Sequence, residues 1–416
     1  MSDIYGISMN LFEKWNSISL LKRIICGMII GIILALVIPQ VTIIGTLGTL
    51  FVNALMAIAP VLVFVLVTAS LARTVTGGGK TMGRIVVLYL IGTFAAAVCA
   101  VLLCTFMTPT LPLEGIEAVS GYDVKTSIFD VLGAMLAKII ANPLGAVVNG
   151  NFLGILVWGI VFGIALRRAG EGTKNFLGEL ADAVTLVIRW VISLAPFGVL
   201  GLVFTAVSEN GLSIFIDYGL VLAILVGCMA FVALVMNPII VYTQIRQNPY
   251  PLVFKCLKES FITAFFTRSS AANIPVNMEL CKNLGLNEKN YSTSIPLGAT
   301  INMAGAAITI TVMTLACVNT LGIEVPLLMK ILLCFVAALG ACGASGVAGG
   351  SLLLIPMACS LFGIPMDIAM QVVGIGFIIG VVQDSCETGL NSSTDALFTA
   401  AAEIHDMKAE GKEYKL

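Results

Sequence analysis

The sequence predicts an all-α polytopic membrane protein, and three observations support that prediction. Of the 416 residues, 59% are hydrophobic and 11% are charged, whereas soluble domains average about 45–50% and about 25%. The mean hydropathy is +1.05. A helix needs about 20 apolar residues to cross a bilayer, and the stretches without Asp, Glu, Lys or Arg reach or exceed that length. They cover residues 24–72, 85–113, 139–166, 190–208, 218–245, 290–323 and 331–366.

This composition excludes a soluble globular enzyme, a disordered chain and a nucleic-acid-binding protein, which would need a basic surface. The eleven cysteines are an odd number, scattered mostly through apolar runs. We interpret them as small buried hydrophobic residues rather than disulfides or metal ligands. The single histidine, His405, lies in the charged tail, which argues against a Ser-His or Cys-His dyad inside the membrane.

Six apolar segments are expected to span the membrane before a less regular block over residues 250–403. The segments are 20–39, 46–72, 84–107, 141–167, 183–207 and 214–245. The first 20 residues are polar and include Glu13 and Lys14, and no small-residue cleavage site follows the first apolar run. A cleavable signal peptide is therefore not expected.

The distribution of Lys and Arg predicts the orientation, because positive loops face the cytoplasm. Positive charge gathers before the first segment, after the second, fourth and sixth, and in the tail, whereas residues 40–45, 108–124 and 208–217 contain none. We therefore expect a multi-pass protein of the cytoplasmic membrane with both termini in the cytoplasm. Segment 126–140 contains Asp130 and Lys138 and is expected to lie as an amphipathic helix at the outer surface.

The block over residues 250–403 mixes apolar runs with polar or glycine-rich interruptions at 267–275, 302–306 and 340–351. Non-helical backbone inside a membrane must be buried in protein or line a cavity. Broken helices of this kind offer N–H groups to substrate carboxylates and carbonyls to sodium. Close packing of small residues is the alternative, but three interruptions within one window favour binding.

Residues 384–395 (DSCETGLNSSTD) are the strongest single feature. At about 100° per residue, Asp384, Thr388, Asn391 and Asp395 lie within a stripe roughly 60° wide on one helix. Each carboxylate exposed to lipid would cost about 2.5–3.5 kcal/mol. A helix end exposed to water would explain Asp395 in part, but it would not explain the whole stripe. We expect the stripe to face a polar site.

With these motifs the chain resembles the dicarboxylate/amino acid:cation symporters, which include the glutamate transporters. The resemblance rests on Phe266–Ser270 with Ile274-Pro275, Tyr291–Gly305 (YSTSIPLGATINMAG), Gly346–Gly349 and Asp384–Asp395, in this order. Leu194–Val199 (LAPFGV) also fits. The similarity extends over nearly the whole chain.

The resemblance implies eight transmembrane helices, two re-entrant hairpins and transport by an elevator motion. Scaffold helices would occupy residues 1–82 and 126–210 and would form a homotrimer. A transport domain would contain a third helix within 83–125 and residues 211–416. The latter comprise a sixth helix, a hairpin at 252–283, a helix at 290–320, a hairpin at 327–362, a helix at 366–402 and the cytoplasmic tail.

The resemblance also implies site roles. Asp384 would hold the substrate ammonium, and Asn391 and Thr388 would lie near its carboxylate. The hairpin tips at Ser269, Ser270 and Val347, together with Met303, would complete the substrate site. One sodium site would use the Asn302 and Asp395 side chains with the carbonyls of Gly298 and Asn391. A second would use the carbonyls of Thr300 and Met303. No other cofactor is implied.

The sequence departs from family members with acidic substrates in three places. Glu387 occupies the position of their substrate-binding arginine, Ala304 that of a sodium-binding aspartate, and Gly92-Thr93 that of a hydroxyl pair. An acidic substrate would meet like charges, so a small neutral substrate is expected: serine and threonine by resemblance, with alanine also fitting. We expect fewer than three sodium ions per substrate. Arg268 is expected to pair with Glu387 or Asp384.

Three other functions compete with this interpretation. A passive channel would lack a closed pocket of zwitterion size. An intramembrane aspartyl enzyme would need Asp384 and Asp395 in near contact, but eleven helical residues separate them by about 16 Å. The nearest alternative is a cation-coupled carrier of dicarboxylates or acidic amino acids from the same family, which would carry a cation where Glu387 stands.

Overall fold

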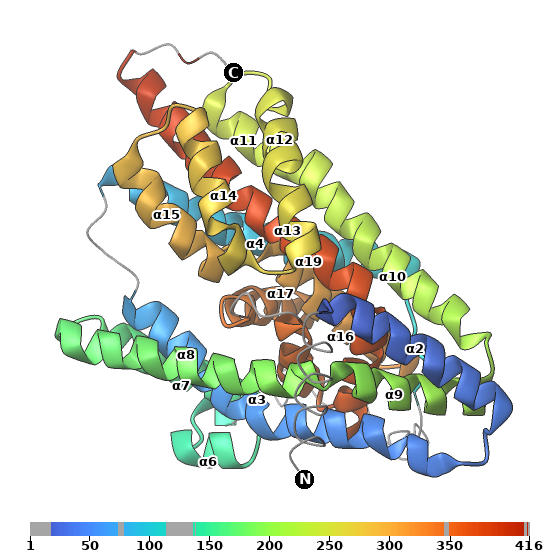
Figure 1. Ribbon diagram of the computed structural model, residues 1–416. Coiled ribbons are helices and arrows are strands. Elements are labelled where there is room, and N and C mark those ends of the chain that lie inside the picture. Colours follow the sequence, from blue (N-terminus) through green and yellow to red (C-terminus); the bar gives the residue numbers. More distant parts are fainter. Residues whose placement is uncertain are drawn as a thin grey trace, which may run out of the picture.

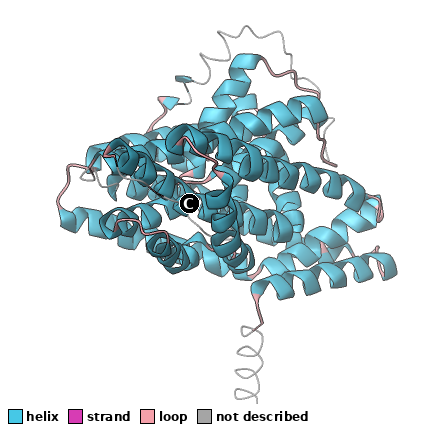
Figure 2. Ribbon diagram, turned by 90° about the horizontal axis from the view of Figure 1, so that it is seen from above, coloured by secondary structure: helices cyan, strands magenta, loops and turns pink. Residues whose placement is uncertain are grey.

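The computed structural model describes residues 18–73, 79–113, 136–137, 139–344, 349–411 and 414. Regular secondary structure in these residues is entirely helical (Figure 2). Five of the described helices are long and apolar enough to cross a membrane, and a sixth span results if the bent pair of helices at Glu171–Asn210 is counted as one. The predicted all-α, multi-pass membrane fold is confirmed.

Four of the six predicted spans form as expected. They are α2 (Leu20–Val37), α3 (Thr46–Arg73), α4 (Lys80–Met107), and α10 (Ile214–Phe231) continued through a π-helical turn, η3 (Val232–Met236), into α11 (Asn237–Ile245). A 3₁₀ turn, η1 (Thr42–Ile44), joins α2 to α3. Apolar runs of this length form helices within a bilayer, because a helix satisfies all its backbone hydrogen-bonding groups within the segment.

The other two predicted spans are each divided into two helices. Segment 141–167 divides into α6 (Pro143–Val148) and α7 (Phe152–Leu166). Gly150 takes a positive φ of 62°, and the Asn151 side chain caps α7 by accepting the Gly154 N–H at 3.3 Å. Segment 183–207 divides into α8 (Glu171–Ser193) and α9 (Ala195–Asn210), which meet at 48°. Pro196 interrupts the helical hydrogen-bond pattern there, because it has no N–H to donate.

Helices α2, α3, α7, α8 and α9 form one packed group, at the lower side of Figure 1. Glycines bring their backbones together. A Cβ on Gly27 of α2 would lie 2.1 Å from the Pro196 carbonyl oxygen of α9, and one on Gly201 of α9 would lie 2.3 Å from the Gly48 nitrogen of α3. Small residues at membrane helix interfaces allow this close approach.

The C-terminal half contains two helical hairpins. Hairpin one consists of a first arm, α12 (Tyr250–Cys256), a π-helical turn η4 (Leu257–Phe261) and α13 (Ile262–Thr267), and a second arm, α14 (Ser270–Asn283). Hairpin two consists of α17 (Leu327–Ala341) and a returning arm of η5 (Gly350–Leu354), α18 (Ile355–Cys359) and η6 (Ser360–Phe362).

Two further elements lie between and after the hairpins. The predicted helix at 290–320 is interrupted: α15 (Glu288–Ile301) ends at Asn302, and α16 (Ala304–Thr320) starts after Met303. The final helix, α19 (Met366–Ala409), is continuous and extends past the predicted end at residue 402. The predicted amphipathic segment 126–140 lies mostly outside the described residues.

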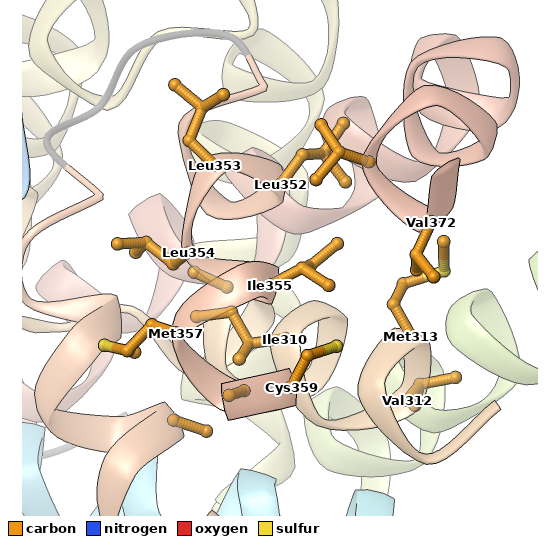
Figure 3. Close-up of a cluster of buried hydrophobic side chains, with 14 of the residues drawn as sticks. Ile310, Val312, Met313, Leu352, Leu353, Leu354, Ile355, Met357, Cys359 and Val372 are labelled. Carbon is orange, nitrogen blue, oxygen red and sulfur yellow. The ribbon is translucent and has the colours of Figure 1, made fainter. Parts of the chain in front are cut away.

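Helices α16 and α19 form the centre of this half. All but the last two residues of α16 are buried, and α16 contacts α4, α10, α17, α18 and α19. Figure 3 shows Ile310 and Met313 of α16 facing Ile355 and Cys359 of hairpin two and Val372 of α19. This apolar packing joins α16, hairpin two and α19.

Candidate functional site

Asp384 is the point at which both hairpins meet α19. Its side chain is 3% exposed. Its Oδ2 lies 2.7 Å from the Arg268 Nε of hairpin one, and its Oδ1 accepts the Gly349 N–H of hairpin two at 3.0 Å. The prediction that Arg268 pairs with Asp384 or Glu387 is thus resolved in favour of Asp384.

The backbone of hairpin one presents Arg268 to this carboxylate. Arg268 ends α13 in the left-handed region, with φ 52°, a conformation that non-glycine residues adopt at a cost. The next residue, Ser269, caps α14 by accepting the Ala272 N–H on its side chain at 3.2 Å. The turn therefore places a guanidinium and a helix N-terminus side by side, both favourable to a carboxylate.

Glu387 lies in a separate cluster of hydrogen-bond donors. Its Oε2 accepts from Thr309 Oγ1 at 2.7 Å, from Ser351 Oγ at 2.8 Å and from Gln383 Nε2 at 2.6 Å. These donors come from α16, hairpin two and α19, and the Glu387 side chain is buried. Three donors from three elements thus converge on one oxygen of a buried carboxyl group.

Asn391 joins α19 to the interruption between α15 and α16. Its Oδ1 accepts the Gly305 N–H at 2.7 Å, and its Nδ2 lies 3.4 Å from the Met303 sulfur. Thr388, one turn before Asn391, and Ser270, at the start of α14, are also buried. The structure thus gathers the predicted substrate residues around α19, except Val347, which lies outside the described residues.

Asn302 and Asp395 form a second buried pair. The Asn302 Nδ2 donates to Asp395 Oδ1 at 2.8 Å, to Thr394 Oγ1 at 2.8 Å and to the Asn391 carbonyl at 3.3 Å. The other oxygens, Asp395 Oδ2 and Asn302 Oδ1, are buried and have no hydrogen-bond partner among the described residues. Buried oxygens without donors fit a hard monovalent cation such as sodium.

Two other predicted sodium ligands lie on α15. A Cβ on Gly298 would lie 2.6 Å from Asp395 Oδ1, so this glycine allows the carboxylate to approach α15. The Gly298 carbonyl accepts the Asn302 N–H at 2.9 Å. The Thr300 hydroxyl donates to the Leu297 carbonyl at 2.7 Å. The predicted sodium ligand of Thr300 is its backbone carbonyl.

Several polar residues of the site escaped the sequence analysis. Tyr89 of α4 places its hydroxyl within 3.0–3.2 Å of the Ser294 carbonyl, the Asp395 carbonyl and Thr399 Oγ1. The Tyr89 hydroxyl interrupts the apolar run at residues 85–92 of α4, which was the available signal. Ser351 belongs to the interruption at 340–351, whereas Thr309 and Gln383 gave no signal, because only the fold brings them to Glu387.

Gly92-Thr93 and Ala304, where the sequence departs from family members with acidic substrates, lie beside the Asn302–Asp395 pair. A Cβ on Gly92 would meet the Phe398 ring at 2.5 Å, and Thr93 Oγ1 accepts the Met303 N–H at 3.2 Å. Ala304 contributes no oxygen from its side chain. Neither Gly92 nor Ala304 thus offers a side-chain oxygen, and the Phe398 ring lies next to Gly92.

Comparison with known proteins agrees with this architecture. The model of the sodium:dicarboxylate symporter family matches residues 20–403. A serine/threonine transporter SstT of Streptococcus thermophilus is 56% identical over 94% of this chain and 97% of its own length. One from Bifidobacterium adolescentis is 57% identical over 96% and 93%, and one from Streptococcus agalactiae is 56% identical over 94% and 97%. The relatives are named as transporters, not enzymes, and the chain belongs to the sodium:dicarboxylate symporter family.

Proposed function

We propose that this protein is a sodium-coupled symporter that takes up serine and threonine across the cytoplasmic membrane. The names of its relatives, at 55–57% identity over almost the entire chain, support the substrate pair. The observation that carries the chemistry is the buried Glu387 carboxyl group, held by Thr309, Ser351 and Gln383. The protein would work as a homotrimer with both termini in the cytoplasm.

The charges around α19 favour a neutral substrate. Asp384 is already paired with Arg268, and Glu387 has no positively charged partner among the described residues. Among the described residues, the site therefore has no free cation for a second carboxylate on the substrate. A side-chain carboxylate brought next to Glu387 would be repelled, which argues against the dicarboxylate or acidic amino acid alternative.

Glu387 also gives a chemical reason for a hydroxyl on the substrate. Oε2 of Glu387 accepts three hydrogen bonds, and Oε1 has no donor among the described residues. A serine or threonine hydroxyl would donate to Oε1. Hydrogen bonds to charged groups contribute about 1.5–3 kcal/mol, so alanine would bind more weakly than serine.

The zwitterionic end of the substrate would lie near Asp384. The substrate ammonium would share the Asp384 carboxylate with Arg268, and the substrate carboxylate would meet the N-terminus of α14 at Ser269 and Ser270, the Asn391 amide and Thr388. Val347 and Met303 would border the same space. Each end would thus meet a group of opposite polarity, which fixes the orientation of the amino acid.

Sodium would bind at the Asn302–Asp395 pair, with carbonyls of Gly298 and Asn391 as further ligands. Asp395 Oδ2 and Asn302 Oδ1 support this assignment because a buried acceptor without a partner costs about 1–3 kcal/mol. A second ion would bind the Thr300 and Met303 carbonyls. Fewer than three ions would accompany each substrate, since Ala304 and Gly92 supply no side-chain oxygen.

The moving unit would be residues 83–125 and 211–416, carried past a scaffold of residues 1–82 and 126–210. The close glycine contacts of α2, α3 and α9 support a rigid scaffold. Hydrogen bonds to Asp384 and Glu387 join both hairpins to α19, which supports their motion as one body around the bound substrate.

The test is uptake of radiolabelled serine into proteoliposomes under an imposed sodium gradient, with glutamate as the control substrate. We expect serine uptake that requires sodium and that is abolished by Asp384→Ala. Uptake of glutamate in place of serine would contradict the role given to Glu387. Serine accumulation without a sodium gradient would contradict the coupling.

A further inference from the structure

A groove lies between α10 and hairpin one, on the side of α19 that carries Cys386. Helix α10 with η3 forms one wall, the first arm of hairpin one forms the other, and Cys386 of α19 lies at its floor. Both walls pack against α19. The groove has a volume of about 540 Å³, and its borders include half-exposed apolar side chains such as Phe254 and Ile262.

Both walls contain a π-helical turn at the level of the groove. Ala233 and Leu234 belong to η3, and Leu257, Lys258 and Phe261 belong to η4. Such turns are rare and frequently occur at functional sites. The Tyr250 hydroxyl donates to the Leu234 carbonyl at 3.2 Å, and this contact joins the two walls at one end.

Lys258 is the only charged residue among those that line the groove. Its side chain is exposed, and it belongs to none of the ion pairs found among the described residues. It follows the start of α12 by eight residues, or about 12 Å of helix. In the orientation proposed above, Lys258 would reach the headgroups of the cytoplasmic leaflet, which carry negative charge.

We propose that this groove binds an anionic phospholipid, with one acyl chain between α10 and hairpin one and the phosphate on Lys258. The apolar walls match an acyl chain, and the single cation at the edge matches a phosphate. A zwitterionic lipid offers Lys258 no net charge. A second copy of this chain is less suited, because an unpaired lysine in an apolar protein interface is costly.

The bound lipid would affect transport through the contact of Phe261 with α19. A Cβ on Gly389 of α19 would lie 2.6 Å from the Phe261 ring, so this ring is in direct contact with the helix that carries Glu387 and Asn391. A bound chain would press the first arm of hairpin one onto α19. This regulatory effect rests on the proposed transport function, whereas the lipid site itself does not.

Lipid binding is tested on purified protein by native mass spectrometry, with phosphatidylglycerol and phosphatidylcholine supplied together. Lys258→Glu should weaken retention of phosphatidylglycerol at least about fivefold, the effect of one lysine near an anionic lipid surface. Ala230→Trp, which fills the groove, should also reduce it. Lys289→Glu and Ile216→Trp, both on exposed positions away from the groove, should retain as much lipid as the unaltered protein.

Each result decides one part of the proposal. Equal retention of both lipids, or unaltered retention in Lys258→Glu, would overturn the phosphate site. Unaltered retention in Ala230→Trp would overturn the acyl-chain site, and an altered oligomeric state in that variant would favour a second copy. Serine uptake in vesicles with and without phosphatidylglycerol then tests regulation: the stimulation by this lipid should disappear in Lys258→Glu and persist in Lys289→Glu. Absence of uptake in every lipid would contradict the transport function while leaving the binding result intact.

Discussion

The Nε atom of Arg268 lies 2.7 Å from Oδ2 of Asp384, although 116 residues separate them in the chain. The two side chains are only 11% and 3% exposed. Because Asp384 also accepts the Gly349 N–H, this carboxylate connects the tips of two hairpins that the sequence places about 80 residues apart. The ion pair therefore fixes hairpin geometry as well as the charge of the site.

Removal of Arg268 should destabilise the protein, because Asp384 would remain buried with its charge unpaired. Loss of one partner of a buried ion pair typically costs about 3–5 kcal/mol. Arg268→Ala should lower the thermal midpoint in detergent, and the double variant Arg268→Ala/Asp384→Asn should recover part of the loss. Strictly additive effects of the two substitutions would argue against the pair. Unchanged serine affinity in Arg268→Ala would argue against its role in the site.

Glu387→Gln should reduce the preference for serine over alanine by about tenfold. A hydrogen bond to a charged acceptor contributes about 1.5–3 kcal/mol and one to a neutral acceptor about 0.5–1.5 kcal/mol. The measurement is competition by unlabelled serine and alanine against labelled serine. Glu179→Gln, at an exposed position on α8, provides the matched control and should leave the preference unchanged. An equal loss for both substrates would place Glu387 outside the side-chain pocket.

Asp395→Asn should weaken the binding of sodium more than the binding of serine. The substitution removes the negative charge from the pair with Asn302 but keeps the shape of the side chain. The sodium concentration for half-maximal uptake should rise at least about tenfold, the equivalent of about 1.4 kcal/mol. Serine affinity at saturating sodium should change far less. A selective loss of serine affinity would mean that Asp395 contacts the substrate.

Gly298→Ala should impair sodium dependence because the new methyl group would collide with the carboxylate of Asp395. The added Cβ would lie 2.6 Å from Oδ1 of Asp395 and 2.9 Å from the Tyr89 hydroxyl. Gly219→Ala is the matched control, since a Cβ there meets nothing within 4 Å. We expect half-maximal sodium to rise in the first variant only. Normal sodium dependence in Gly298→Ala would show that the carboxylate does not need this approach.

The measured coupling number should be below three sodium ions per serine. Ala304 and Gly92 provide no side-chain oxygen beside Thr93, and the Phe398 ring fills the space next to Gly92. The reversal potential of serine flux in proteoliposomes at fixed sodium and serine gradients gives this number directly. A value of three would mean that backbone oxygens and Thr93 suffice for a further ion.

The sequence by itself determined the membrane-embedded helical fold, because long apolar segments can cross a bilayer only as helices. It also located the main site residues, since carboxylates such as Asp384 and Asp395 are costly inside a membrane unless they have a function. Helix breaks at Asn149–Asn151 and Leu194 were missed, because they depend on local capping by Asn151 and on Pro196 within segments that are mainly apolar.

Only the tertiary structure decided which groups meet. It paired Arg268 with Asp384 and left Glu387 to the donors Thr309, Ser351 and Gln383, a choice that charge alone left open. It also brought Tyr89 to Asp395 across 306 residues of chain. Hydrogen bonds and ion pairs act over about 3–4 Å, so their partners are set by how the helices pack, whereas burial in lipid acts on each segment separately and can be predicted from its composition.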